Sequence, residues 1–335
     1  MRKAAPAHRY AVITDSNVYG LYGNRLEDQF EPHTIDVLTV PAGETSKTRE
    51  MWGTLTDRML ISGFGRDSAI VALGGGVVGD LAGFVAATYM RGVPVVQIPT
   101  TLLAMIDASI GGKTGIDTPA GKNLVGAFHH PAAVLIDPQV LDTLPLRELR
   151  AGIAELIKYG AIADQSYFAE VEAALPDLLS GNLGNSDRAR SIIVRSVEIK
   201  SEIVSRDERE NGLRKVLNFG HTIGHAVELI SGYSLLHGEA VAIGMALEGA
   251  VAERIGVART GTAGEITRVL ELAGLPTTLP PDIGLEAVIE AMRSDKKRRG
   301  ANTMMSVPLR IGAMAGQDSG WTVSVGDDQL REVLA

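Results

Sequence analysis

The chain has 335 residues, of which 45% are hydrophobic and 21% are charged, the usual balance for a folded globular protein with a sizeable core. Asp and Glu outnumber Lys and Arg by 40 to 32, and the net charge of -8 argues against general binding to nucleic acids or anionic membranes. The absence of cysteine excludes disulfides, cysteine-ligated zinc and a cysteine nucleophile. The N-terminus lacks the apolar core of a signal peptide, and no run of about 18 apolar residues occurs, so we expect a cytoplasmic protein.

Residues 1–145 alternate β-rich runs with helical stretches. The strands are predicted at residues 10–14, 35–40, 68–73, 93–98 and 133–136, with helices between them that include 24–29 and 47–62. Strands that alternate with helices predict a parallel sheet covered on both faces. The nearly continuous apolar run from Ala69 to Leu73 is typical of a central, doubly buried strand. We therefore predict an α/β, Rossmann-like nucleotide-binding domain.

Residues 146–335 have a different pattern, in which strand signals largely stop. Helices are predicted at 146–163, 187–205, 221–230, 238–255, 265–273 and 285–294, and one short strand near 304–307. This part is therefore predicted to be a mainly α-helical second domain. We expect a ligand-binding cleft between the two domains, since ligand sites often lie at domain interfaces.

A glycine-rich segment follows the apolar strand directly. Gly74, Gly75 and Gly76 precede Val77 and open the next predicted helix. Glycines allow a close backbone approach, and the N-terminus of a helix offers amide hydrogens to a phosphate. The segment does not match the GxGxxG fingerprint, but its place between strand and helix favours phosphate or dinucleotide binding over a plain tight turn.

Three of the seven histidines lie close together in the second domain. His221 and His225 are four residues apart and share one face of the predicted helix, and His237 follows soon after. Imidazoles suit zinc, iron and related metals, and Glu155, an acid in an apolar helix, could complete the ligand set. The alternative is a polar seam between helices with no metal. HExxH is absent, which argues against a metalloprotease of that type.

Basic residues recur in apolar or glycine-rich surroundings of this acidic chain, at Lys113, Lys122, Lys158, Lys200, Arg214, Lys296 and Lys297. Singly, each is typical of a solvated surface charge. Together they favour a pocket for a small, multiply anionic substrate. Asp207 and Glu210 are interpreted either as an acid/base pair or as a helix end.

Six segments occur in the order found in 3-dehydroquinate synthases, and the chain resembles that family of sugar phosphate cyclases over nearly its whole length. They are residues 73–93, 99–118, 121–128, 144–161, 207–226 and 237–245. The resemblance implies an NAD-binding N-terminal domain, a helical metal-binding C-terminal domain and a homodimer. It also implies a fold similar to that of metal-dependent glycerol dehydrogenases.

The implied enzyme is a lyase of the shikimate pathway, which leads to the aromatic amino acids. It converts 3-deoxy-D-arabino-heptulosonate 7-phosphate to 3-dehydroquinate and phosphate. NAD oxidises a ring hydroxyl transiently, phosphate is eliminated, the ketone is reduced again, and the opened enol closes by an intramolecular aldol step. A ketone acidifies the neighbouring hydrogen, and a divalent metal, zinc or cobalt, polarises the oxygens involved.

The resemblance also assigns roles to individual residues. The metal ligands are Glu155, His221 and His237, so that His225 handles protons instead of binding the metal. The catalytic residues are Glu210, His225, Lys158 and Lys200. The substrate contacts are Arg91, Asp107, Lys113, Asn123, Lys158, Lys200, Arg214, Asn218, His237, Lys296 and Lys297. The NAD contacts are Asp15, Asn17, Glu44, Lys47, Gly75, Gly76, Val77, Asp80, Thr100, Thr101, Lys113, Lys122 and Thr143.

Two features depart from the family pattern. The chain begins close to the strand at 10–14, whereas many members carry a further N-terminal strand region, so we expect an exposed sheet edge. The arginine-rich run at 295–300 leaves open which of Lys296 and Lys297 contacts the substrate. The implied role of Arg91 is contact with the substrate phosphate, either within its own chain or across the dimer.

Related cyclases, which form 2-epi-5-epi-valiolone, 2-deoxy-scyllo-inosose or aminodehydroquinate, share the metal and NAD residues. Arg214, Asn218 and the pair of lysines favour a carboxylate-bearing substrate, although the amino variant differs from it by only one nitrogen. A second alternative is a glycerol-dehydrogenase-like oxidoreductase with net hydride transfer, which the many basic residues disfavour. The third is a binding protein without catalytic activity.

Overall fold

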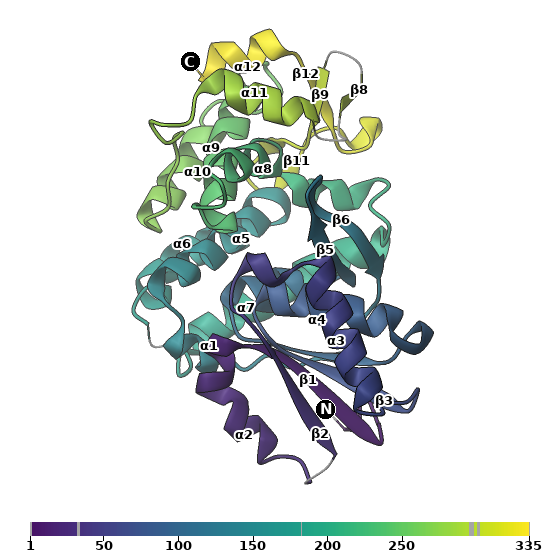
Figure 1. The fold of residues 1–335 in the computed structure, drawn as a ribbon. Coiled ribbons are helices and arrows are strands. Elements are labelled where there is room, and N and C mark those ends of the chain that lie inside the picture. Colours follow the sequence, from purple (N-terminus) through teal and green to yellow (C-terminus); the bar gives the residue numbers. More distant parts are fainter. Residues whose placement is uncertain (1, 32–33, 182, 295–297, 300–301, 335) are drawn as a thin grey trace. The chain divides into compact units, whose positions relative to one another are not determined.

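The structure is a computed structural model that describes residues 2–31, 34–181, 183–294, 298–299 and 302–334 (Figure 1). The chain divides into two compact units, Met1–Leu141 and Asp142–Ala335. Among the described helices, none combines the length and the apolar character that a bilayer span requires.

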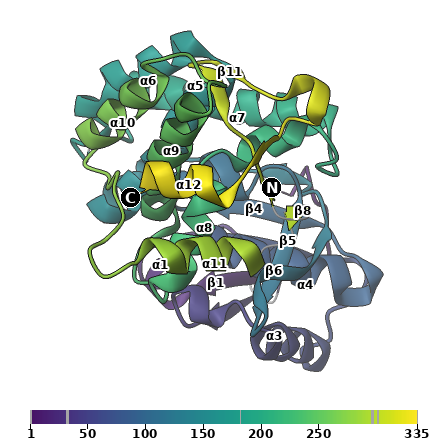
Figure 2. The ribbon, with the colours of Figure 1, turned by 90° about the horizontal axis from the view of Figure 1, so that it is seen from above.

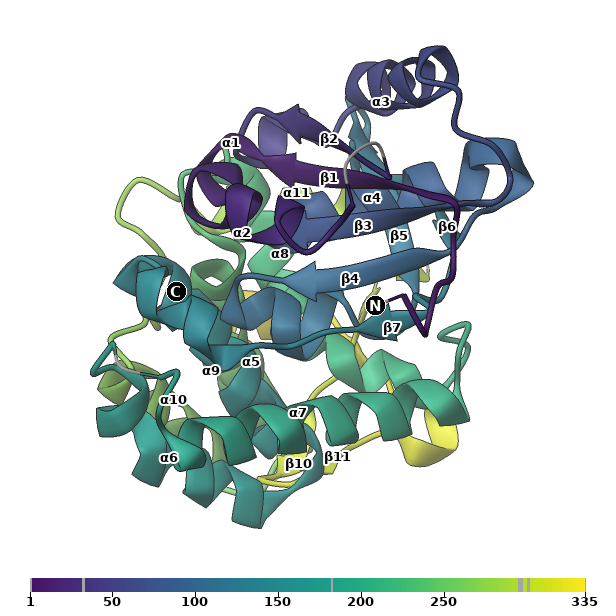
Figure 3. The ribbon, with the colours of Figure 1, turned by 90° about the horizontal axis from the view of Figure 1, so that it is seen from below.

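The N-terminal unit is built on a five-stranded sheet in which every paired neighbour is parallel. Figure 3 shows its strands side by side in the order β2 (Ile35–Val40), β1 (Arg9–Asp15), β3 (Ser68–Gly74), β4 (Val95–Pro99) and β7 (Ala133–Val134). The predicted parallel sheet is therefore confirmed. Strand β4 starts two residues later than predicted, after Pro94, which has no backbone N–H to donate to a ladder.

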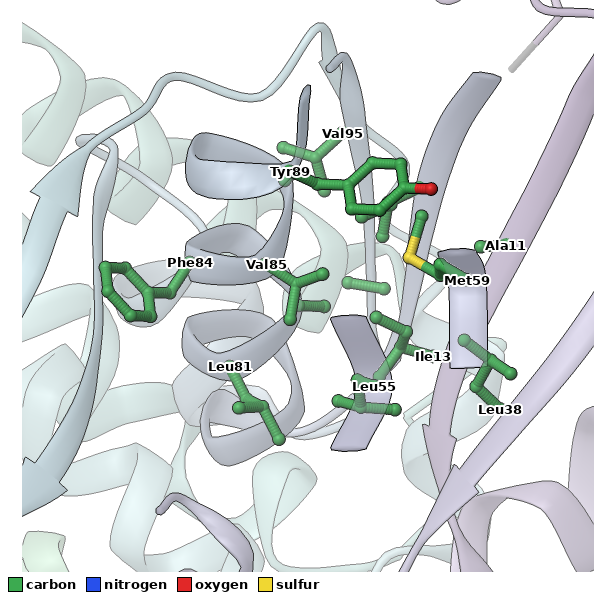
Figure 4. Packing of buried hydrophobic residues seen from close by; sticks show 14 of the residues in the cluster. Ala11, Ile13, Leu38, Leu55, Met59, Leu81, Phe84, Val85, Tyr89 and Val95 are labelled. Carbon is green, nitrogen blue, oxygen red and sulfur yellow. The ribbon is translucent and has the colours of Figure 1, made fainter. Parts of the chain in front are cut away.

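Both faces of this sheet are covered, as predicted. Ile13 of β1 joins an apolar cluster with Leu55 of α3 (Arg49–Ile61) and Leu81 of α4 (Gly76–Thr88) (Figure 4). Tyr10, on the opposite side of the same strand, joins a second cluster that includes Phe30. Successive side chains of a strand point to opposite faces, so one strand supplies both clusters.

The N-terminal unit also contains an antiparallel hairpin that the sequence analysis did not predict. It consists of β5 (Lys113–Thr118) and β6 (Gly121–Phe128). Its polar and glycine-rich strands lack a clear apolar alternation, but Ile116 and Val125 pack against the cluster around α4. Short helices or helical turns complete the unit: α1 (Ser16–Val18), Tyr19–Gly23, α2 (Asn24–Glu27), Glu44–Ser46, Tyr89–Arg91, Ala104–Ala108 and Pro138–Thr143, the last of which crosses the unit boundary.

The C-terminal unit is mainly helical, as predicted (Figure 2). Its helices are α5 (Leu146–Ala163), α6 (Gln165–Leu178), α7 (Asp187–Arg206), α8 (His221–Ile230), α9 (His237–Arg254), α10 (Thr262–Leu272), α11 (Leu285–Ser294) and α12 (Asp327–Leu334). Helices α6 and α12 were not predicted. Two helical turns, Leu213–Asn218 and Gln317–Ser319, lie between the longer elements.

More strands follow α11 than the single one predicted there. Strand β9 (Asn302–Met305) contains part of the predicted run and lies between β12 (Val323–Val325) and β8 (Arg298–Arg299). A separate pair is formed by β10 (Pro308–Arg310) and β11 (Ala313–Met314). These strands are two to four residues long, too short for a two-residue alternation to identify them.

The Asp164 carboxylate closes the start of α6 and pairs with α7. Its Oδ1 accepts the backbone N–H groups of Ser166 and Tyr167 at 3.0 and 3.1 Å, and its Oδ2 lies 3.0 Å from Arg195. Burial raises the pKa of Asp164, but hydrogen bonds from the Ser166 hydroxyl (2.6 Å), the Tyr167 N–H and Arg195 outweigh it and lower the pKa to about 2. The carboxylate therefore stabilises the folded chain while it stays ionised.

We expect Asp164→Ala to lower the free energy of unfolding by about 1 kcal/mol at pH 7, the usual cost of losing a helix cap. The folded pKa lies below the unfolded value of about 3.9, so this loss should be complete above about pH 4 and shrink as the pH falls toward 2. Urea unfolding at several pH values measures it. Asp187→Ala, which removes an exposed ion pair with Arg190, is the control and should change little. A loss that did not depend on pH would contradict the assignment.

Candidate metal and nucleotide sites

The carboxyl ends of the parallel strands bring five of the predicted NAD residues to one edge of the sheet. Asp15 ends β1, Gly75 and Gly76 follow β3, and Thr100 and Thr101 follow β4. The next two strands in the sequence, β2 and β3, lie on opposite sides of β1. Such a switch point is where parallel α/β sheets bind nucleotides.

The start of α4 is shaped for close backbone approach. A Cβ atom added to Gly75 would lie 3.1 Å from Thr101 Cγ2, and one added to Gly74 would lie 2.6 Å from Val78 Cβ. The N-cap is Gly75, which has no side chain to cap the helix, so the first amides, including that of Val77, are not covered from this position. A glycine turn followed by an uncapped helix N-terminus fits the pyrophosphate of a dinucleotide such as NAD.

A buried cation lies at the centre of a second group of predicted residues. Lys47 is 3% exposed, and its Nζ lies 2.6 Å from Asp80 Oδ2 and 2.5 Å from Asn123 Oδ1. Glu44 lies 3.9 Å from Lys47 and 3.4 Å from Lys122. Burial alone would lower the pKa of Lys47, but the carboxylates of Asp80 and Glu44 raise it above the usual value. Lys47 is therefore a fixed positive charge that links α4 to the hairpin.

Other predicted NAD and substrate contacts also lie within residues 1–145. Burial raises the pKa of Asp80, and the negative charge of Asp107 adds to the rise, which places Asp107 in the same region. Lys113 is exposed at the start of β5. The Asp15 carboxylate accepts the backbone N–H of Asn17 at 2.8 Å. Thr143, predicted to contact NAD, belongs to the C-terminal unit.

Arg91 lies in a strained turn. Met90 and Arg91 have φ values of 49° and 68°, in the left-handed region, and Gly92 follows at 117°. Left-handed conformations of residues other than glycine cost of the order of 1 kcal/mol each and cluster at functional sites. Arg91 is exposed, so its guanidinium is accessible to an anion.

A buried carboxylate lies at the centre of the helical unit. Glu155, in the middle of α5, is 0% exposed. Its Oε1 accepts no hydrogen bond from any residue in the described part of the chain, while Oε2 is in ion-pair contact with Lys158. Burying a charge is costly unless it is paired or coordinates a metal. The unsatisfied oxygen therefore points to a cation beyond Lys158.

A glycine contact brings His237 to this carboxylate. A Cβ on Gly238 would lie only 2.0 Å from the carbonyl oxygen of Ala151, so the start of α9 touches the backbone of α5. Ala151 is one helical turn before Glu155. Glu239 fixes this end of α9 because its Oε2 accepts the backbone N–H of Leu236 at 2.8 Å. His237 Nε2 thereby lies 3.9 Å from Glu155 Oε1.

His221, at the start of α8, faces the same oxygen. Its Nε2 lies 3.7 Å from Glu155 Oε1, and its Nδ1 lies 3.1 Å from the carbonyl oxygen of Phe219. Burial, helped by the positive charge of Lys158, lowers the pKa of His221 well below the usual value, so the imidazole is neutral, as a metal ligand must be. In His237, Nδ1 lies 3.3 Å from Glu228 Oε2.

The donor set fits a divalent metal. Ligand atoms of Glu155, His221 and His237 all lie within 4.8 Å of one another. Two imidazoles and one carboxylate suit zinc or cobalt and leave a coordination position open for a substrate. The structure thus brings together the three residues that the family resemblance assigns to the metal.

His225 has a different environment from the other two histidines. Its ring lies 5.1 Å from that of His221 and 5.9 Å from that of His237, but the side chain is exposed. Together with Glu228 and His237 it forms a second group whose ligand atoms lie within 4.8 Å. The first group contains the unsatisfied buried oxygen of Glu155, which makes it the better metal site.

Sequence reasoning missed Glu228. It lies seven residues after His221 on α8, and this spacing, two helical turns on the same face, is a signal that could have identified it. It is buried beside His237. A carboxylate in this position orients a histidine ligand and raises its basicity.

The segment after α7 contains four other residues singled out from the sequence, Asp207, Glu210, Arg214 and Asn218. The Asp207 carboxylate accepts the backbone N–H groups of Asn211, Gly212 and Arg214 at 3.0, 2.7 and 3.0 Å, so it acts as a helix end rather than as an acid/base partner. Glu210, with φ of 60°, accepts a hydrogen bond of 2.5 Å from Asn218 Nδ2. Arg214 is 2% exposed, and its guanidinium donates to the carbonyl oxygen of Glu208 at 2.6 Å.

Two other predictions concern lysines. Lys200 lies buried, 6% exposed, on the amphipathic helix α7. Lys296 and Lys297 lie outside the described residues.

Comparisons with known proteins agree with these observations. The family model described as 3-dehydroquinate synthase N-terminal matches residues 37–151, and the one described as 3-dehydroquinate synthase C-terminal matches residues 152–298. The 3-dehydroquinate synthase of Thermoanaerobacter pseudethanolicus is 48% identical over 337 residues, a match that spans 100% of this chain and 92% of the relative.

Two solved structures of cyclases have a TM-score of 0.88 and cover 99% of this chain, with 91% of their own chains matched. One is the 2-epi-5-epi-valiolone synthase of Streptomyces hygroscopicus with NAD+ and Zn2+ bound, 33% identical. The other is a 2-deoxy-scyllo-inosose synthase complexed with carbaglucose-6-phosphate, NAD+ and Co2+, 28% identical. The predicted fold class is confirmed, and the two family models together match well over half of the sequence. The chain therefore belongs to the 3-dehydroquinate synthase family.

Proposed function

We infer that the chain catalyses the reaction of 3-dehydroquinate synthase. It converts 3-deoxy-D-arabino-heptulosonate 7-phosphate to 3-dehydroquinate and phosphate, with NAD and one divalent metal ion and with no net redox change. The inference depends chiefly on the identity of 44–48% to 3-dehydroquinate synthases along nearly the whole chain. The buried group of Glu155, His221 and His237 supports it.

Glu155, His221 and His237 would hold the metal, which supplies Lewis-acid polarisation of substrate oxygens when bound. Lys158 lies against the Glu155 carboxylate from inside α5 and adds a positive charge where an anionic substrate would bind. These roles are supported by the burial of both side chains.

The edge of the sheet in the N-terminal unit would hold NAD, which supplies reversible hydride transfer when bound. The uncapped start of α4, with Gly75 and Gly76, would bind the pyrophosphate. Asp15, at the end of β1, is placed where an acid commonly meets a ribose hydroxyl. Lys47 and Asp80 are held rigidly by their mutual ion pair, which suits residues that orient a cofactor.

We propose that Glu210 and His225 move protons. The Glu210 carboxylate is held in one position by the hydrogen bond from Asn218 and by its own left-handed backbone. His225 is exposed beside the metal ligands, so an imidazole nitrogen can reach a bound substrate. Arg214 and Lys200, both buried cations, would contact the carboxylate and the hydroxyl oxygens of the substrate.

The other sugar phosphate cyclases are the second candidate, favoured by the similarity of the fold to the valiolone and inosose synthases. An assay with zinc, catalytic NAD and 3-deoxy-D-arabino-heptulosonate 7-phosphate distinguishes the two candidates. It measures phosphate release and identifies the carbocyclic product by mass. Formation of 3-dehydroquinate without accumulation of NADH is expected. Turnover of a different sugar phosphate alone would support another cyclase, and stoichiometric NADH would indicate an oxidoreductase.

We expect Arg91→Ala to raise the KM for the phosphorylated substrate by roughly tenfold or more, since a charge-assisted contact to phosphate contributes about 1.5–3 kcal/mol. Steady-state kinetics with the purified variant measure the effect. Arg66→Ala, which removes another exposed arginine of the same unit, is the control and should leave the KM unchanged. Unaltered kinetic constants in Arg91→Ala would exclude a phosphate contact.

We also propose that the enzyme is a cytoplasmic homodimer. The proposal depends on the family resemblance, which implies a dimer and a cytoplasmic metabolic role. Sedimentation velocity of the purified protein tests the dimer, and fractionation of the source cells tests the location. A monomer with full activity would contradict the first part.

A further inference from the structure

Glu248 is a fully buried acid that the reaction does not use directly. It lies on α9, three helical turns after the metal ligand His237, and is 0% exposed. Its Oε2 accepts the backbone N–H of Gly220 at 2.8 Å, and its Oε1 accepts the backbone N–H of Ile223 at 2.8 Å. Gly220 is the N-cap residue of α8, the helix that begins with His221, and Ile223 lies in its first turn. Glu248 therefore caps α8 from a neighbouring helix.

The fold requires this cap to come from another helix. The N-cap residue of α8 is Gly220, which has a φ of 80° and no side chain to accept a hydrogen bond. A Cβ at this position would lie 2.5 Å from Met245 Cγ and 2.8 Å from the carbonyl oxygen of Val241. Serine or aspartate, the usual N-cap residues, therefore cannot replace the glycine. Without Glu248 the buried amides at the start of α8 would lose their acceptors.

The amide of Gly220 is part of the same peptide group as the carbonyl of Phe219. This group is planar, so its N–H and C=O point in opposite directions and move together. Its N–H donates to Glu248, and its C=O lies 3.1 Å from His221 Nδ1. A carbonyl oxygen only accepts, so this bond requires the proton of the neutral ring to lie on Nδ1. The lone pair is then on Nε2, which faces Glu155.

We propose that Glu248 is a positioning residue for the metal ligand His221 and acts through the Phe219–Gly220 peptide group. Both oxygens of Glu248 accept backbone N–H groups, as the two oxygens of a carboxylate do, and the bond to Gly220 polarises the peptide and strengthens its carbonyl as an acceptor. A stronger acceptor fixes the imidazole tautomer and makes Nε2 more basic, which is what a carboxylate bonded directly to a histidine ligand does. The other ligand, His237, has the direct version of this arrangement in Glu228.

The same helix supplies a matched control. Glu253, also on α9, accepts the backbone N–H of Ala263 at 2.6 Å, in the first turn of α10. The N-cap of α10 is again a glycine with positive φ, Gly261, at 94°. Glu253, which is half-buried, thus also accepts a backbone N–H at the start of a helix that follows a glycine, but α10 contributes no residue to the metal group. A comparison of the two acids separates helix capping from positioning of the metal ligand.

The test compares wild type, Glu248→Gln and Glu253→Gln as full-length chains freed of metal by a chelator. Zinc affinity is measured by competition with a chromophoric chelator, and geometry by the visible absorption of the Co2+ form. Removal of a residue that supports a metal ligand typically costs about 10–100-fold in metal affinity. We expect a loss of this size and shifted cobalt bands in Glu248→Gln, with wild-type affinity and bands in Glu253→Gln.

Wild-type zinc affinity and cobalt bands in Glu248→Gln would overturn the proposal, and so would equal losses in both variants. If Glu248→Gln does not fold, two measurements remain. Glu248→Asp keeps the charge with a shorter reach and should lose part of the affinity. In the zinc-loaded wild type, 15N NMR of the His221 ring should show a protonated Nδ1. Metal bound at Nδ1 would refute the proposal that Glu248 acts on His221 through the Phe219–Gly220 peptide group.

The proposal rests on the metal site of the proposed function. Its readouts need no substrate and no NAD, so they stand even if the chain acts on another sugar phosphate. Wild-type protein that bound no zinc would instead contradict the metal site itself.

Discussion

Glu155→Gln should abolish tight zinc binding. The variant removes the only carboxylate in the group formed with His221 and His237 and leaves two neutral imidazoles. Loss of a direct ligand should cost more than the roughly 10–100-fold typical of residues that support ligands. We therefore expect the zinc affinity of the variant to be more than about 100-fold below that of the wild type. Elemental analysis after gel filtration and competition with a chelator measure the loss.

The same substitution should also destabilise the folded chain, which calls for a control. Lys158 is 1% exposed and is paired with Glu155, so Glu155→Gln leaves a buried cation without its counter-charge. Breaking one side of a buried ion pair costs about 3–5 kcal/mol. The double variant Glu155→Gln, Lys158→Met removes both charges at similar volume. It should recover most of the stability and still fail to bind zinc.

The outcome of the double variant decides between a structural and a ligand role. Recovery of stability without zinc shows that the metal was lost because its ligand was lost. Recovery of both stability and zinc binding would mean that the single variant failed through misfolding and that Glu155 is not a ligand. Unchanged metal content in Glu155→Gln alone would also exclude it as a ligand.

The second large effect is expected from Gly244→Ala in α9. A Cβ at this position would lie 1.9 Å from the carbonyl oxygen of Gly220 and 2.9 Å from the backbone nitrogen of Gly224. Backbone atoms of α8 cannot move aside as a flexible side chain can, so the two helices must separate. We expect a loss of about 3 kcal/mol in the free energy of unfolding, at the upper end of typical overpacking costs. Urea unfolding of the metal-free protein measures it.

Zinc affinity should fall in Gly244→Ala as well, because Gly220 directly precedes His221 and moves with it. The control is Gly264→Ala, in the first turn of α10, where an added Cβ would meet nothing within 4 Å. Alanine at such a helical position stabilises by about 0.5–1 kcal/mol. The two substitutions should therefore change stability in opposite directions, and only the first should affect zinc. A neutral effect of Gly244→Ala would contradict the close contact of α8 and α9.

The sequence predicted the elements of both units well where long periodic or apolar runs define them. The apolar run of β3 and the helical period of α5 and α8 gave their positions to within a residue. The hairpin of β5 and β6 was missed because its strands are stabilised by packing against α4 rather than by a local alternation. Most of the short strands after α11 were missed because two to four residues are too few to show an alternation.

By itself, the pattern of residues determined that two histidines share a helix face and that a buried acid needs a partner, but it left the ligand set open. The family resemblance then named Glu155, His221 and His237. Only the tertiary structure shows why these three meet: α9 contacts α5 at Gly238 and contacts α8 at Gly244, with backbone against backbone. A contact between two helices that are far apart in the sequence produces no periodic residue pattern in either helix. The direction of a histidine nitrogen, and the acid that acts on it through a peptide group, are therefore decided by packing.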